Sequence, residues 1–181
     1  HRNFMAYASV SRGFQFGGVN ASTTVLPFNN PLTGAPPPHD FESSSLWSRE
    51  IGIRTDWLDR TLRADLTYFN LDWTDAQFSV YQDSVLVDAT YVDNVGKVRS
   101  QGLETTLAWI TPLPGLSLNF AGAYTQALTA APYTGADGEV VPSGTDMPMT
   151  PRLQTATTVS HAALLGPWAI NTMLVHTWTG P

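Results

Sequence analysis

The chain has 181 residues, a formal net charge of −6 and one lysine, Lys97. Only 13% of its residues are charged, against about 25% in an average globular protein, while 43% are hydrophobic and 11% aromatic. The acidic balance excludes nucleic acid as a partner, which needs a basic surface, and the aromatic content argues against disorder. The absence of cysteine excludes disulfides, thiolate metal sites and a cysteine nucleophile.

Neither end has a recognisable targeting segment. The chain opens on His1 without a basic and apolar leader, and it ends at Pro181 directly after an alternating segment. We therefore expect both ends to be cut from a longer protein. No run of about 18 apolar residues is present, which excludes a transmembrane helix, whereas spanning strands need only about 9–11 alternating residues.

The first half of the chain alternates apolar and polar residues in three main segments. Asn3–Arg12 predicts a strand, and Gly13–Ser45 predicts a long loop because it has no sustained period. Trp47–Trp57 places Trp and Ile on one face, with Arg49 and Thr55 as exceptions, and charged residues on the other. Thr61–Trp73 follows after a short turn at 58–60, and weaker alternation continues through 76–82 and 85–92.

Lys97–Ile110 shows the two faces most clearly. Leu103, Leu107 and Trp109 share one face, whereas Gly102 and Glu104 share the other. A strand with one apolar face and one small, polar face fits either a soluble sheet above a core or a wall between lipid and water. The apolar face is expected to meet lipid if the wall spans a membrane.

The remaining chain continues the pattern. Thr111–Gly115 is a turn rich in Pro and Gly, Leu116–Ala127 is a strand, and 128–150 is a second long loop. Arg152–Ala162 and Trp168–Trp178 form a last hairpin. Short turns at 58–60, 111–115 and 163–167 alternate with longer loops at 13–45, 82–96 and 128–150.

The fold class predicted from this pattern is all-β, an antiparallel transmembrane β-barrel segment of about eight strands. Its short periplasmic turns and long extracellular loops are typical of outer-membrane barrels. A soluble β-sandwich shows the same alternation within a strand, but bulky residues would then fill its inward face. Here that face carries Ser, Gly, Glu, Arg, Asn and Ala, which suits a watery or plugged lumen.

Four motifs resemble those of TonB-dependent outer-membrane receptors, and they occur in the family's order. YASVSRGF at 7–14 with GGVN at 17–20 resembles the family's "YASYSRGFKPGGFN", and SREIGIRT at 48–55 resembles "YELGLKT". The segment from Tyr68 to Gln77 resembles "FYxxWxDxQ", and the segment from Val92 to Glu104 resembles "VNAGKAxSxGxE". Later, Met149–Arg152 is similar to the family's "xPR" strand entry.

The resemblance implies a partial receptor barrel over residues 1–181, without the plug domain, the TonB box and the final strand. Such receptors lie in the outer membrane of Gram-negative bacteria. They take up scarce ligands, most often ferric siderophores, with energy from the TonB complex. The implied partners are outer-membrane lipid, the remaining barrel and plug, the TonB complex and a small-molecule ligand. A passive porin or small closed barrel and a soluble β-sandwich binding module remain as alternatives.

The candidate site residues follow from the faces and loops. Glu50, Arg54 and Glu104 lie on the polar faces of their strands and are expected to face the lumen. We expect them to be solvated or paired across strands rather than to contact a ligand. Ligand contacts in the two long loops have weak candidates in Arg12, Phe14, Phe16 and Tyr133.

Metal binding and catalysis find no support in the sequence. The four histidines are scattered without metal-ligand spacing, and no nucleophile elbow is present. We therefore expect no cofactor, no metal site and no enzymatic activity. The six Trp lie near predicted strand ends, which is typical of the aromatic girdles at membrane interfaces; a stacking platform for sugars is the alternative.

Overall fold

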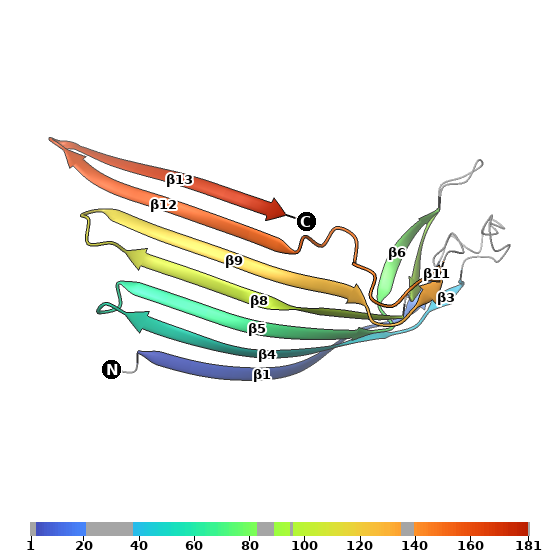
Figure 1. Cartoon of the computed structure of the whole chain (residues 1–181). Coiled ribbons are helices and arrows are strands. Elements are labelled where there is room, and N and C mark those ends of the chain that lie inside the picture. Colours follow the sequence, from blue (N-terminus) through green and yellow to red (C-terminus); the bar gives the residue numbers. More distant parts are fainter. Residues whose placement is uncertain (1–2, 21–37, 83–88, 95, 135–139, 181) are drawn as a thin grey trace.

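The computed structural model describes residues 3–20, 38–82, 89–94, 96–134 and 140–180, and all regular structure in these ranges is β-strand. The described part contains no helix that could cross a membrane. Seven long antiparallel strands form one sheet in the order β1-β4-β5-β8-β9-β12-β13 (Figure 1). These are β1 (Phe4–Gln15), β4 (Ser44–Trp57), β5 (Leu62–Thr74), β8 (Lys97–Ile110), β9 (Leu116–Thr129), β12 (Leu153–Leu165) and β13 (Trp168–Gly180).

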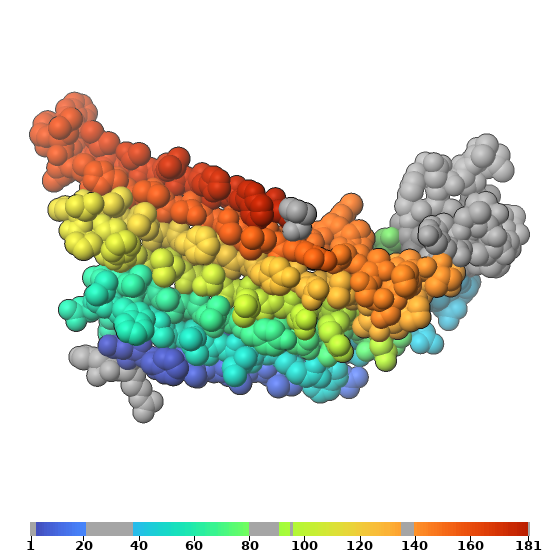
Figure 2. Space-filling model, in the orientation of Figure 1, coloured from blue at the N-terminus to red at the C-terminus, as the bar shows by residue number. Residues whose placement is uncertain are grey.

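The sheet is a single layer, which we call the wall. Its strands lie side by side from β1 to β13 in the space-filling view (Figure 2). Among the described residues, only Ala76, Tyr91 and Val98 are buried apolar side chains, and all three lie at the loop end of the wall. In the part of the chain that the structure describes, the middle of the wall therefore has no hydrophobic core, and many of its large apolar side chains are exposed.

All three short connections lie at one end of the wall (Figure 1). The first is the turn between β4 and β5, where Leu58, Asp59 and Arg60 have φ of 51°, 54° and 70°. The second closes with Gly115 at φ 76°, and the third is the two-residue turn between β12 and β13, with Gly166 at φ 61°. All three short turns predicted from the sequence are confirmed. Positive φ suits glycine at 115 and 166, whereas non-glycine residues adopt it at 58–60.

The opposite end carries three small two-stranded sheets. β2 (Gly18–Val19) pairs with β3 (Asp40–Phe41), β6 (Gln77–Gln82) with β7 (Ala89–Asn94), and β10 (Tyr133–Thr134) with β11 (Val140–Val141). The wall has seven strands rather than about eight because Gln77–Gln82 and Ala89–Asn94, in the region of the two weaker alternating segments, pair as the separate β6–β7 hairpin. Asp75, at φ 51°, turns the chain out of the wall, and its neighbour Ala76 donates its backbone N–H to Gly96 O at 3.0 Å.

The first long loop begins later than the sequence indicates. β1 continues through Gln15, where it pairs with Ser44, so Arg12 and Phe14 lie on a wall strand. The backbone pairing with β4 continues past Gly13, where a Cβ would meet no atom within 4 Å. Most of the expected loop, residues 21–37, lies outside the described residues, as does the centre of the loop at 135–139.

Candidate functional site: the polar face of the wall

The strand register confirms the predicted two faces. Cross-strand partners in an antiparallel sheet point to the same side. Arg54, Asp65 and Thr106 form one such row, and Gly52, Thr67 and Glu104 form the next. We call the face that carries Glu50, Arg54 and Glu104 the polar face. The opposite, apolar face carries Ile51, Ile53, Leu66, Leu103 and Leu107.

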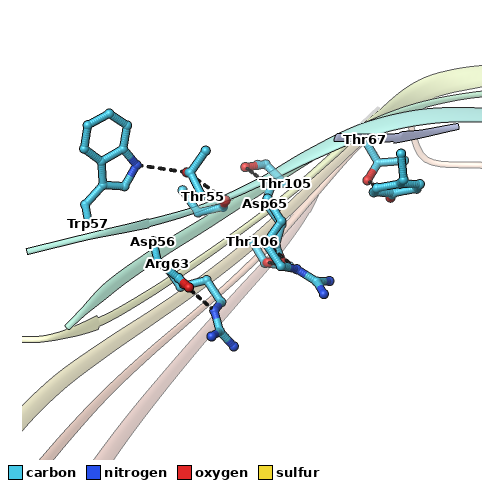
Figure 3. A network of polar contacts seen from close by, with 11 residues as sticks. Thr55, Asp56, Trp57, Arg63, Asp65, Thr67, Thr105 and Thr106 are labelled. Atoms are coloured by element: carbon cyan, nitrogen blue, oxygen red, sulfur yellow. Dashed lines mark hydrogen bonds and ion pairs between the residues drawn. The ribbon is translucent and has the colours of Figure 1, made fainter. Parts of the chain in front are cut away.

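Arg54 is paired across the strands. Its Nε lies 3.0 Å from Asp65 Oδ1, and Thr106 Oγ1 lies 3.3 Å from the other carboxylate oxygen. Nearer the turn, Arg63 Nε donates to Asp56 Oδ1 at 2.9 Å (Figure 3). Asp65 and Asp56 were not singled out in the sequence. Both pairs are placed symmetrically about the 58–61 turn, and this symmetry is the signal that could have found them.

Two glycines on the polar face are covered by aromatic rings. Tyr7 lies over Gly52 and its hydroxyl is 2.7 Å from Thr67 Oγ1. Phe69 lies over Gly102, where a Cβ would come within 2.7 Å of the ring and would collide with Tyr124 O. Aromatic side chains that cover strand glycines help to fix register, so these pairs hold the centre of the face in one arrangement.

Glu104 lies where three shallow hollows of the polar face meet. The first, of about 410 Å³, is also lined by Thr106, Ala121 and Gln154. The other two border Tyr7, one beside Arg54 and the other beside Glu50. Among the described residues, neither Glu50 nor Glu104 forms an ion pair; Glu50 accepts a hydrogen bond from Ser48 Oγ at 3.3 Å. In the described part of the chain, the face therefore offers two carboxylates that form no ion pair.

The weak loop candidates do not join this face. Arg12 and Phe14 lie on β1 in register with Trp47 and Ser45, on the apolar side, and Phe14 packs edge-on against Phe16 at 5.1 Å. Tyr133 lies in β10, in a small sheet at the loop end. No group of three or more acidic or histidine side chains that could hold a metal occurs within the described residues.

These features can be compared with those of known proteins. A family model described as "TonB dependent receptor-like, beta-barrel" matches residues 1–181. The chain belongs to the TonB-dependent receptor β-barrel family. Barrels of this family are outer-membrane proteins of Gram-negative bacteria, so the wall is part of an outer-membrane receptor barrel.

Solved structures show the same fold at low identity. The ferric yersiniabactin uptake receptor FyuA from Yersinia pestis is 19% identical, with a TM-score of 0.68 over 99% of this chain and 24% of that one. The copper transporter OprC is 14% identical, with a TM-score of 0.64 over 94% and 24%. The alcaligin receptor FauA from Bordetella pertussis is 13% identical, with a TM-score of 0.53 over 99% and 27%. The chain spans about a quarter of each of these proteins.

The loop end of this receptor wall is braced by side-chain amides. Asn94 Nδ2 donates to Asp75 O at 2.8 Å and Glu42 O at 3.1 Å, and its Oδ1 accepts the Glu42 N–H at 2.7 Å. Gln77 Nε2 donates to Glu42 O at 2.7 Å and Phe16 O at 3.0 Å. These hydrogen bonds join the β6–β7 hairpin to the segments that flank β2 and β3 at the loop end of the wall.

Replacing Asn94 with Ala is expected to loosen this brace. The substitution leaves the Glu42 N–H without its acceptor, at a local cost of about 1–3 kcal/mol. Hydrogen exchange at Glu42 and its neighbours should accelerate in the full-length receptor, while the wall strands keep their protection. Asn119→Ala, at an exposed strand position without a side-chain hydrogen bond in the described part, is the control. Unchanged exchange at Glu42 in Asn94→Ala would contradict the brace.

Tyr91 gives the β6–β7 hairpin a dependence on alkaline pH. Its side chain is 6% exposed, and burial, followed by the charge of Asp93, raises its pKa above the ordinary value. The folded hairpin therefore holds the phenol proton more tightly than the unfolded chain. Its contribution to stability is complete below pH about 10, the ordinary tyrosine pKa, and is lost as pH rises through the folded value.

We expect proteolytic protection of the hairpin to fall above pH about 10 in the native receptor and to fall less in Tyr91→Phe, which cannot ionise. Limited proteolysis across a pH series, followed by mass spectrometry of the fragments, measures this difference. The same slope in both proteins would show that another group controls the alkaline loss.

Proposed function

We propose that this chain is a wall segment of a receptor for TonB-energised uptake of a scarce ligand, most fittingly a ferric siderophore. The polar face would line the lumen and the apolar face would contact lipid. The observation that carries this proposal is the two-faced, single-layer wall itself. One face exposes large apolar side chains and the other exposes carboxylates and hydroxyls, and among the described residues no second layer covers either face.

The positions of the tryptophans support this sidedness. Trp47 and Trp57 lie ten residues apart on the apolar face of β4, and Trp168 and Trp178 lie ten residues apart on the same face of β13. At about 3.3 Å per residue and a strand tilt of about 40°, this spacing corresponds to about 25 Å across the membrane, the height of a barrel's apolar band. Trp109 also lies on this face, next to the turn end.

Trp73 does not lie on the apolar face, where a girdle of all six tryptophans was expected. It has the parity of the polar face and packs against Phe78 at 5.5 Å between ring centroids. Trp73 therefore contributes to the packing between the wall and the β6–β7 hairpin.

Glu50 and Glu104 would act in the lumen. Two carboxylates that form no ion pair within the described residues favour contact with positively charged groups supplied from outside this chain. The plug domain expected in the remainder of the receptor would provide such groups, and the path of the ligand would run beside it. Arg54, held by Asp65, would instead stabilise the wall. Binding and transport, rather than catalysis, follow from this arrangement.

The ligand class rests on the structural neighbours. Two of them are named for uptake of ferric yersiniabactin or for alcaligin, and one is a copper transporter. A ferric siderophore is therefore the class to test first, with copper as a comparison.

Transport by the full-length receptor tests the proposal. The gene would be expressed in a host that lacks its own siderophore receptors, with and without TonB, and supplied with radioactive iron bound to yersiniabactin or alcaligin. We expect accumulation of at least one complex only when TonB is present. Equal uptake without TonB would indicate a passive porin, and uptake of copper alone would replace the siderophore as the ligand.

Sidedness can be tested independently with single cysteines, because residues 1–181 contain none and any cysteine elsewhere in the receptor can first be replaced by serine. Single cysteines would be introduced at Glu104 and Leu107 of the full-length receptor in vesicles. A water-soluble maleimide should modify the first, and a lipid-attached quencher should reach a fluorophore on the second. The reverse pattern would overturn the assignment of both faces.

A further inference from the structure

Five charged residues of the described strands lie on the apolar face: Lys97, at the first residue of β8, and four others that gather in one place. Arg12, Arg49, Asp72 and Arg99 all share the parity of Ile51 and Leu103 and sit towards the loop end of β1, β4, β5 and β8. We call them the arginine cluster. Of these four, the sequence identifies only Arg49 as an exception on the apolar face. Their proximity follows from the pairing register of the strands.

The arginine cluster surrounds Trp47, the tryptophan nearer the loop end of β4. Arg12, Asp72 and Arg99 belong to the same cross-strand row as Trp47, and Arg49 lies two residues nearer the turns. Since Trp47 and Trp57 are separated by about 25 Å across the membrane, Trp47 marks the border between hydrocarbon and headgroups, and the cluster lies beside it. It is the border on the side of the long loops.

The contacts leave the cluster with uncompensated positive charge. Asp72 accepts from Arg49 at 2.6 Å and from Arg99 at 2.9 Å, and the Arg12 guanidinium lies 5.5 Å from the centre of the Trp47 ring. The cluster thus holds three guanidiniums and one carboxylate, which pairs with two of them. The side chains of Arg49 and Arg99 remain 50% and 57% exposed, so several of their N–H donors point away from the protein.

This charge is local, because the whole chain has a net charge of −6 and nine basic residues. A row of guanidiniums at headgroup height is complementary to phosphate, which arginine binds through paired N–H donors. The apolar side chains directly below it, such as Ile51 and Tyr68, are exposed and suit acyl chains. Lipid headgroups with phosphate match both halves of this surface, whereas free phosphate matches only the upper half.

We propose that the arginine cluster binds the phosphate groups of phosphorylated lipid in the leaflet next to the long loops. Asp72 holds Arg49 and Arg99 in place, and Trp47 holds Arg12, so that the three guanidiniums form a preorganised row. The inference rests on the lipid-facing assignment made under the proposed function, and it adds a lipid site to it.

The test uses the full-length receptor extracted in mild detergent and incubated with lipid A, which carries phosphates on a glycolipid. The Arg12→Gln/Arg99→Gln receptor is compared with Arg63→Gln. Arg63 is a matched control, because it pairs with Asp56 at 2.9 Å and is 55% exposed, but on the polar face. Native mass spectrometry counts the bound lipid A, and gel mobility before and after heating verifies the folded barrel.

We expect the double variant to bind lipid A at least fivefold more weakly, since each basic residue at a membrane surface contributes about a fivefold gain. Arg63→Gln should bind like the native receptor, and millimolar inorganic phosphate should displace little lipid. Equal binding by the native and double-variant receptors would overturn the proposal, as would complete displacement by inorganic phosphate. If the water-soluble maleimide modifies Leu107→Cys, the lipid-facing assignment of the apolar face is wrong. If the lipid-attached quencher reaches Leu107→Cys but the double variant binds lipid A like the native receptor, only the proposed lipid site is wrong.

Discussion

Replacing Leu107 with Arg is expected to destabilise the receptor by about 2–3 kcal/mol. Leu107 lies on the apolar face of β8, three residues from the turn end at Ile110 and between Ala64 and Phe120. An arginine at this depth would place its charge within the hydrocarbon, where it costs about 2–4 kcal/mol at the midplane and less towards the interfaces. Guanidinium titration of the full-length receptor in phospholipid vesicles measures the loss.

Ala108→Arg is the matched control, because it inserts the same side chain one residue away on the opposite face. Ala108 is exposed and borders a hollow with Asn119 and Thr158, so the arginine has room and water. We expect a change below about 1 kcal/mol. Glu104→Gln should also leave the free energy of unfolding nearly unchanged. Similar losses for Leu107→Arg and Ala108→Arg would contradict the two-faced wall.

Replacing Gly102 with Ala is expected to cost about 1–3 kcal/mol, the range for overpacking. The new Cβ would collide with the Tyr124 carbonyl oxygen and approach the Phe69 ring. The carbonyl belongs to the β8–β9 ladder and cannot move without loss of pairing, so the ring and both strands must shift. The free energy of unfolding and the yield of folded receptor in the outer membrane should both fall.

Gly13→Ala is the corresponding control on another wall strand. A Cβ at Gly13 meets no atom within 4 Å in the described part of the chain. Because alanine also restricts the unfolded chain, this substitution should be neutral or slightly stabilising. If both glycine substitutions cost the same, the penalty would reflect glycine's place in a strand rather than the contact with Tyr124.

The faces of the wall were predictable from the sequence, whereas the contacts on them were not. Leu103, Leu107 and Trp109 fall opposite Gly102 and Glu104 as expected. Arg54 was expected to be solvated or paired, and it is paired with Asp65. That partner depends on how β4 and β5 are aligned, since a shift by one residue would bring Arg54 opposite Ala64 or Leu66 instead.

The ends of the strands were less predictable. Asp75, Ala76 and the segment after them alternate almost like a wall strand, and only the turn at Asp75 separates the β6–β7 hairpin from β5. Arg12 and Phe14 flank Gly13 and resemble the start of a loop, yet β4 continues to pair with both of them. Local composition predicts neither the end of β5 nor the extension of β1, because a strand ends where its neighbour no longer supplies backbone hydrogen-bond partners.

The sequence by itself therefore determined an all-β wall with one apolar and one polar face, and its four ordered motifs indicated the receptor family. Side-chain alternation is a local property of an extended chain, so it is readable without a partner strand. Only the tertiary structure decided that Glu104 lies among three hollows, that Tyr124 and Phe69 require a glycine at 102, and that Arg12, Arg49 and Arg99 meet around Asp72 and Trp47. These results depend on register, which is set between strands far apart in the sequence.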